Sequence, residues 1–222
     1  MEECCQCECI EGTFNRKVAD ADLKRYHRKG PAKTTQALIN ALKDEGVEGL
    51  TLLDIGGGIG AIQHELFGAG VVSATHVDAA SAHIEVAKEE SERRGKIDRV
   101  GYHHGDFVAL APDIELADIV TLDRVICCYH DMESLVRLSS AKARSLYGLV
   151  YPRTSWWAKI YWRALKLPRN IWPWIQRKPF RSYFHDSKAV DDVARSNGFD
   201  QLFDCKTGIW QIVVYGRRNP TQ

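Results

Sequence analysis

The feature that most limits the fold of this chain is the stretch from Leu52 to Gly60, which reads Leu-Leu-Asp-Ile-Gly-Gly-Gly-Ile-Gly. An apolar run contains an acidic residue, Asp54, and a glycine-rich turn follows before a helical pattern begins at Ala61. This order predicts a buried parallel strand, a tight turn and a helix N-terminus, where an α/β sheet holds a nucleotide-like ligand. Glycines let the backbone approach that ligand, and N–H groups of the first helical turn can bind an anionic group.

Strand and helix patterns alternate along the rest of the chain. Strand patterns lie near 50–55, 73–77, 99–104, 117–122, 146–151 and 209–215, and helical patterns include 132–145 and 187–196. This alternation predicts an α/β protein with a doubly wound parallel sheet. We expect a Cys-rich tail and basic arm over 1–33, and one domain over 34–222 with an inserted cap at about 153–185.

Composition narrows the class of partner and compartment. A net charge of +1 over 222 residues gives no overall attraction to nucleic acid. The chain has no run of eighteen uncharged apolar residues, and its first residues lack the pattern of a signal peptide. We therefore expect a cytoplasmic protein with no nucleic-acid partner, whose seven cysteines are reduced thiols or metal ligands.

Two ligand classes compete for the glycine turn. Gly56, Gly58 and Ala61 formally satisfy the dinucleotide pattern Gly-x-Gly-x-x-Gly/Ala, which keeps an NAD-linked oxidoreductase open. Asp54 directly before the turn instead suits a ligand that carries an amino group. Asp78, eighteen residues after Gly60, can bond both ribose hydroxyls in either case.

The third and last strands add to this comparison. Gly105-Asp106-Phe107 ends the third strand, where Asp106 can accept from an adenine amine while Phe107 packs on the ring. With the closing helix, Gly198-Phe199 and the last strand, residues 34–151 and 185–216 resemble a class I S-adenosylmethionine-dependent methyltransferase. The resemblance implies a seven-stranded sheet with one antiparallel strand and S-adenosylmethionine at the carboxyl ends of its first strands. The cofactor-binding residues it implies are Asp54, Gly56, Gly58, Gly60, Asp78, Asp106, Phe107 and Asp123.

The segment after the fourth strand is where a base for methyl transfer is expected. His130 has a pKa range suited to proton removal, and Tyr129 could orient an acceptor. The alternative is that His130-Asp131 only starts the next helix, with Asp131 as its cap. We predict catalytic roles for His130 and Tyr129 and no resident metal.

The same segment is similar to the magnesium-protoporphyrin O-methyltransferase group. That group has the form Leu-Asp-x-Leu-Ile-His-Tyr-Pro, which resembles the sequence of 122–129. Cys127 stands where the motif has histidine, and one residue is inserted before Tyr129, so no catalytic residue carries over from this group.

The predicted cap at 153–185 holds five of the six tryptophans, with eight basic residues and no acid. It fits a lid over a flat or apolar acceptor with anionic groups. It also fits a peripheral membrane anchor, a nucleic-acid surface or ordinary packing.

Four cysteines crowd the N-terminus, at Cys4, Cys5, Cys7 and Cys9. Their spacing fits no standard zinc pattern, so a disordered reduced tail is the leading interpretation and a metal site the second. A third interpretation is that this tail folds over the pocket and joins Cys127 or Cys128 in holding a thiophilic acceptor such as a metalloid.

Together these patterns predict a methyltransferase that acts on a small molecule. The alternatives are a cofactor-binding or metal-sensing protein without turnover, and the NAD-linked oxidoreductase. The sequence leaves open the acceptor, its reacting atom and the oligomeric state.

Overall fold

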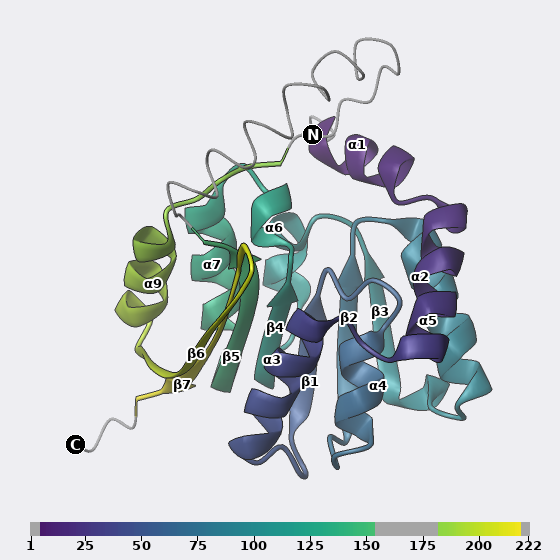
Figure 1. The fold of residues 1–222 in the computed structure, drawn as a ribbon, viewed down its shortest axis with the longest axis horizontal. Helices are drawn as coiled ribbons and strands as arrows, with labels where there is room; N and C mark the ends of the chain where they lie inside the picture. The colour runs from purple at the N-terminus through teal and green to yellow at the C-terminus, as the bar shows by residue number, and fades with distance from the viewer. Residues whose placement is uncertain (1–4, 154–181, 219–222) are drawn as a thin grey trace.

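The structure is a computed structural model that describes residues 5–153 and 182–218. These residues form a seven-stranded sheet in the order β3-β2-β1-β4-β5-β7-β6 (Figure 1). The strands are β1 (Thr51–Ile55), β2 (Ser73–Asp78), β3 (Val100–His104), β4 (Ala117–Asp123), β5 (Ala143–Pro152), β6 (Phe199–Thr207) and β7 (Trp210–Arg217). β7 runs antiparallel to both of its neighbours, whereas β1 to β5 pair in parallel. The predicted doubly wound sheet with one antiparallel strand is therefore confirmed.

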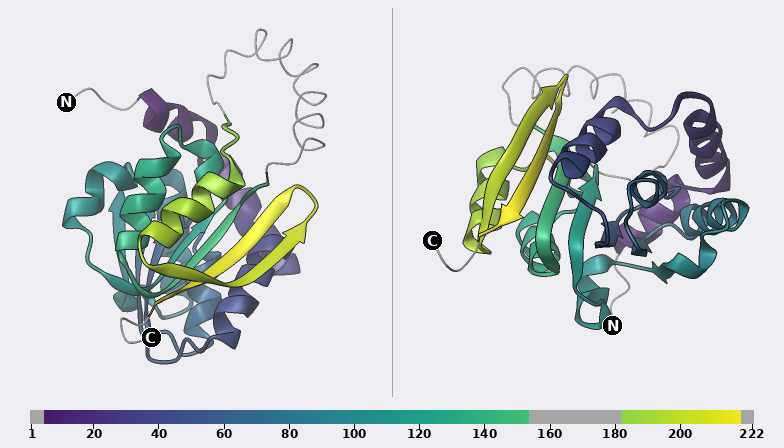
Figure 2. Two further views of the ribbon diagram at one scale, coloured as in Figure 1. Left: turned by 90° about the vertical axis from the view of Figure 1, so that its left-hand side faces the viewer. Right: turned by 90° about the horizontal axis from the view of Figure 1, so that it is seen from below.

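Helices cover both faces of this sheet (Figure 2). The helices are α1 (Cys5–Thr13), α2 (Arg16–Lys29), α3 (Lys33–Asp44), α4 (Ala61–Phe67), α5 (Ser81–Arg93), α6 (Phe107–Leu110), α7 (Met132–Ala141) and α9 (Ser187–Ser196). Three short 3-10 helices are η1 (Ile97–Arg99), η2 (Ala111–Asp113) and η3 (Ile126–Cys128).

Two hydrophobic clusters sandwich the sheet. On one face, Leu53 and Ile55 of β1 pack with residues of α6, α7 and α9. On the other face, Leu52 packs with residues of α3 and α4. Because parallel strands are buried on both faces, their sequences are almost continuously apolar, which is why β1 and β4 were predictable.

Three elements differ from the sequence expectation. β6 carries no apolar run, since most of its residues are exposed at the sheet edge. α7 ends at Ala141 and β5 starts at Ala143, because the exposed residues 144 and 145 hide the start of that strand. Residues 5–13 form α1, so the predicted disordered tail is wrong for these residues.

The tryptophan-rich part of the predicted cap, over 154–181, lies outside the described residues. Among the helices that the structure does describe, none has the length and apolar character needed to cross a membrane.

Candidate functional site

The glycine turn joins β1 to α4 at the edge where the parallel strands end. Gly56, Gly58 and Gly60 have φ angles of +63°, +55° and +78°, a left-handed region that glycine adopts without steric cost. At position 57 a glycine is needed because there is no room for a side chain: a Cβ there would lie 2.5 Å from His76 Cε1 and 2.9 Å from Asp54 Oδ2.

The amide groups of this turn already have acceptors within the protein. Gly56 and Gly57 donate to the Val77 carbonyl, Gly58 to Asp78, and Gly60 to the Gly57 carbonyl. The glycines therefore offer close approach rather than donors, and an anionic group would have to meet the N–H groups at the start of α4.

Asp54 lies beneath the turn and is only 1% exposed. Its Oδ1 accepts a 2.7 Å hydrogen bond from the Thr121 hydroxyl, whereas Oδ2 has no hydrogen-bond partner among the residues that the structure describes. Burial, with a smaller effect from the charges of Asp123 and Asp78, raises the pKa of Asp54 to about 7. A buried acceptor without a donor is costly, so this atom is suited to a cationic or donating group of a ligand.

Asp78 closes β2 on the other side of the turn. Its Oδ2 accepts from Gly58 N and its Oδ1 from Ala80 N, both at 2.8 Å. A carboxylate has about four acceptor positions, so these two bonds leave capacity for hydroxyl groups. Asp78 therefore shapes the turn and remains able to bind a ribose.

A cavity of about 110 Å³ lies between the glycine turn and the α2–α3 arm. From the turn side it is lined by Asp54, Gly56 and Gly58, and from the arm by residues that include Asp22, Tyr26 and Thr35. This volume is well below the roughly 300 Å³ at which ligand pockets begin. The cavity is therefore too small to enclose a whole nucleoside-sized ligand.

Asp123 also lines this cavity, at the end of β4. The Thr35 hydroxyl donates to its Oδ2, and Arg124 Nε donates to its Oδ1 at 3.0 Å. Asp123 thus ties the arm to the sheet, a role that its position after an apolar strand could not reveal.

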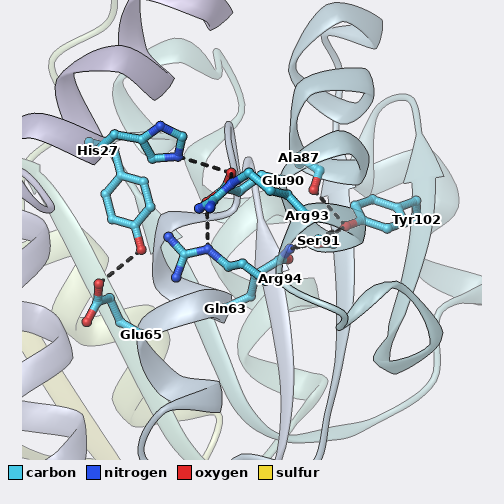
Figure 3. A network of polar contacts seen from close by, with 10 residues as sticks. His27, Gln63, Glu65, Ala87, Glu90, Ser91, Arg93, Arg94 and Tyr102 are labelled. Atoms are coloured by element: carbon cyan, nitrogen blue, oxygen red, sulfur yellow. Dashed lines mark hydrogen bonds and ion pairs between the residues drawn. The ribbon is translucent and has the colours of Figure 1, made fainter.

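A buried carboxylate holds the arm against α5 (Figure 3). Glu90 is 1% exposed and accepts hydrogen bonds from Arg93 and Arg94, while His27 of α2 lies 3.0 Å away. Burial alone would raise the pKa of Glu90, but these hydrogen bonds hold it well below its usual range. Tyr26 extends the contact by donating to Glu65 at 3.0 Å.

The N-terminal helix α1 lies at the edge of the sheet where the parallel strands end (top of Figure 1). Glu11 accepts from the backbone N–H of Ser81 at 2.9 Å, and His104 Nε2 lies 3.5 Å from its carboxylate. No sequence pattern in 1–16 indicated this contact, since it joins residues 70 positions apart.

Of the predicted adenine-binding and catalytic residues, the structure joins Asp106 to Tyr129 by a hydrogen bond. Asp106 caps α6 by accepting from Val108 N at 2.9 Å, and its other oxygen accepts from the Tyr129 hydroxyl at 2.9 Å. Phe107, the first residue of α6, is 4% exposed and packs in the hydrophobic core.

His130 is exposed, and its ring stacks on Tyr129 with centroids 5.3 Å apart. Asp131 caps α7 by accepting from Ser134 N at 3.1 Å, which confirms the cap interpretation for Asp131. The catalytic roles of His130 and Tyr129 stay predictions.

Comparison with known proteins supports one class of fold. Residues 53–140 match the family model described as "Methyltransferase domain". No curated protein matches the chain in sequence.

Several solved structures share the fold over most of the chain. Magnesium protoporphyrin IX methyltransferase (ChlM) from Synechocystis PCC 6803 with bound SAM aligns with a TM-score of 0.69 at 15% identity, over 98% of this chain and 100% of that chain. The same protein with bound SAH aligns with a TM-score of 0.70 at 17% identity, over 96% and 100%. An O-methyltransferase family protein from Burkholderia thailandensis aligns with a TM-score of 0.65 at 13% identity, over 94% and 64%.

Proposed function

We propose that this chain is a class I methyltransferase, as its sequence predicted, and that it transfers a methyl group from S-adenosylmethionine to a small molecule; the matched methyltransferase domain and the shared fold support this. The observation that carries the proposal is the buried Oδ2 of Asp54, which faces the glycine turn without a partner. An ammonium group is the complement of this atom, and a pyrophosphate would be repelled by it.

Each residue around the turn binds a different part of the cofactor. Asp54 holds the amino group, the glycines allow the methionine part to approach the backbone, and Asp78 accepts from the ribose. Asp106 accepts from the adenine amine, beside Phe107. When bound, S-adenosylmethionine supplies a methyl group that is already activated by the positive sulfur.

The protein then has to align and dehydrate the acceptor. We propose that the acceptor enters between the basic N-terminal arm (within 1–33) and the cap, where Tyr129 orients it and His130 removes its proton. The predicted membrane contact rests on the cap and lies outside the described residues. The cytoplasmic location and the absence of a nucleic-acid partner are also proposals.

The two alternatives differ at the same site. A protein without turnover would bind S-adenosylmethionine without releasing S-adenosylhomocysteine. An NAD-linked oxidoreductase would need room for a pyrophosphate at the turn. That ligand would face the carboxylates of Asp54 and Asp123, both of which line the cavity.

Calorimetric titration with S-adenosylhomocysteine and NAD tests the proposal. We expect binding of the first ligand only. Asp78→Ala should weaken it by about 1–3 kcal/mol, the cost of an unmade polar contact. Asp98→Ala, an exposed carboxylate in η1, is the matched control and should bind normally. NAD binding, or unchanged affinity in a folded Asp78→Ala variant, would contradict these assignments.

A further inference from the structure

Two adjacent cysteines, Cys127 and Cys128, take no part in the function proposed above. They lie at the end of η3, and their Sγ atoms are 3.8 Å apart. Both sulfurs also lie near the Arg124 carbonyl oxygen, at 3.3 and 3.5 Å. The turn therefore gathers two neighbouring thiols around one point.

The backbone holds this arrangement in a strained form. Arg124 has a φ of +64°, the only positive φ of a non-glycine residue in the part of the chain that the structure describes. Such a conformation costs on the order of 1–2 kcal/mol. Arg124 N donates to the Val150 carbonyl at 2.8 Å, and Tyr183 N donates to the Cys127 carbonyl at 2.7 Å, so the turn is fixed from both sides. Strain maintained by surrounding contacts is a reason to look for function.

The thiol pair lies next to the proposed cofactor turn. A Cβ built on Gly56 would come within 2.4 Å of Val125 Cγ2, so the residue that directly precedes η3 packs on the glycine turn. The negative charge of Asp78 also acts on Cys128. The two cysteines therefore share the edge of the sheet at which the ligand is expected.

The two thiols differ in reactivity. Cys127 is 9% exposed and Cys128 is half-buried. Their mutual hydrogen bond holds the pKa of the Cys128 thiol below its ordinary value, and the same bond together with burial raises the pKa of Cys127. Cys128 is thus the thiol that reacts first, and Cys127 is in place to react second.

Ligand number decides what such a pair can bind. Structural zinc takes four ligands, and the described residues contain no group of three or more candidate metal ligands. A trivalent metalloid that carries one organic group needs only two sulfurs, and soft thiolate ligands favour soft centres.

We propose that Cys127 and Cys128 form a dithiol site that captures a thiophilic trivalent metalloid, such as a monosubstituted arsenic(III) compound. Two As–S bonds form and two As–OH bonds break, and the two thiol protons leave in two molecules of water. Arsenic stays trivalent, so no oxidant or reductant is required. The capture does not depend on methyl transfer, so it and the proposed function can fail separately.

Phenylarsine oxide is the probe. The starting protein is the whole 222-residue chain with Cys4→Ser, Cys5→Ser, Cys7→Ser and Cys9→Ser, so that the N-terminal thiols do not compete. We expect one equivalent to bind, with the adduct mapped by mass spectrometry to a peptide that contains 127–128. A dithiol should reverse it, and the same concentration of a monothiol should not. Cys128→Ser and Cys127→Ser should each weaken binding by roughly 100-fold or more, because one bond replaces two linked bonds.

Cys205 on β6 provides the matched control, and Cys205→Ser should bind normally. Retained stoichiometric binding in both serine variants at 127 and 128, an adduct on other residues, or no adduct at all would overturn the proposal. Peptide mapping needs no change at 127 or 128, so the test holds even where those variants fold poorly.

Discussion

The charge state of Asp54 leads to the most specific prediction. Burial raises its pKa from 3.8 to about 7, so the folded protein holds a proton that the unfolded chain releases above pH 4. The free energy of unfolding therefore falls as pH rises from 3.8 to 7 and changes no further on this account above 7. About three pH units at 1.36 kcal/mol each give a total cost of about 4 kcal/mol at high pH.

Asp54→Asn removes this cost, because the amide cannot ionise and can still accept from Thr121. Between pH 5 and pH 8.5 the stability of the variant relative to the parent should rise by about 3 kcal/mol. Urea unfolding of both proteins across this range measures the difference, in which effects of all other groups cancel. Parallel pH profiles for the two proteins would refute the assigned charge state.

The same residue should couple pH to ligand binding. An ionised Asp54 pairs with an ammonium group, so the affinity for S-adenosylhomocysteine should rise up to about tenfold per pH unit below pH 7. In Asp54→Asn this slope should vanish, and affinity at pH 7.5 should fall by about 1.5–3 kcal/mol, the range for a hydrogen bond to a charged group. A slope retained in the variant would contradict the assignment of this pH dependence to Asp54.

Three further predictions concern the framework of the site. Gly56→Ala should destabilise the protein by about 1–3 kcal/mol more than Gly46→Ala in urea unfolding, because both have positive φ but only the first would press against Val125. Asp131→Ala should cost about 1 kcal/mol through loss of the α7 cap, and a change within 0.3 kcal/mol would reject that role. Glu90→Gln should cost about 1–3 kcal/mol in the same assay, whereas Glu89→Gln, whose partner Arg16 is exposed, should cost less than about 1 kcal/mol. Since the pKa of Glu90 is lowered, its stabilising effect should be lost as pH falls below about 4, and equal effects of the two variants would contradict it.

The sheet and its glycine turn could be predicted because their signals are local. Strands buried on both faces are apolar throughout, and left-handed turn positions need glycine. β6 was not predicted because it lies at the edge of the sheet and buries few residues, so its sequence has no apolar run. The start of β5 was missed because residues 144 and 145 are exposed, although the strand itself lies inside the sheet.

The candidate site was predictable only in part. Asp54, Asp78 and Asp106 end strands or follow them, so their place at one edge follows from topology. The contacts of Thr35 with Asp123, His27 with Glu90 and Glu11 with Ser81 join distant segments. Such contacts produce no periodic pattern in the sequence, and the unpartnered Oδ2 of Asp54 produces none either.

The central claim is that the turn after β1 binds the amino acid end of S-adenosylmethionine. A crystal structure of the complex with S-adenosylhomocysteine tests it most directly. We expect the ligand's amino group within hydrogen-bond distance of Asp54 Oδ2 and the ribose at Asp78. A ligand bound elsewhere, or an amino group remote from Asp54, would contradict the account.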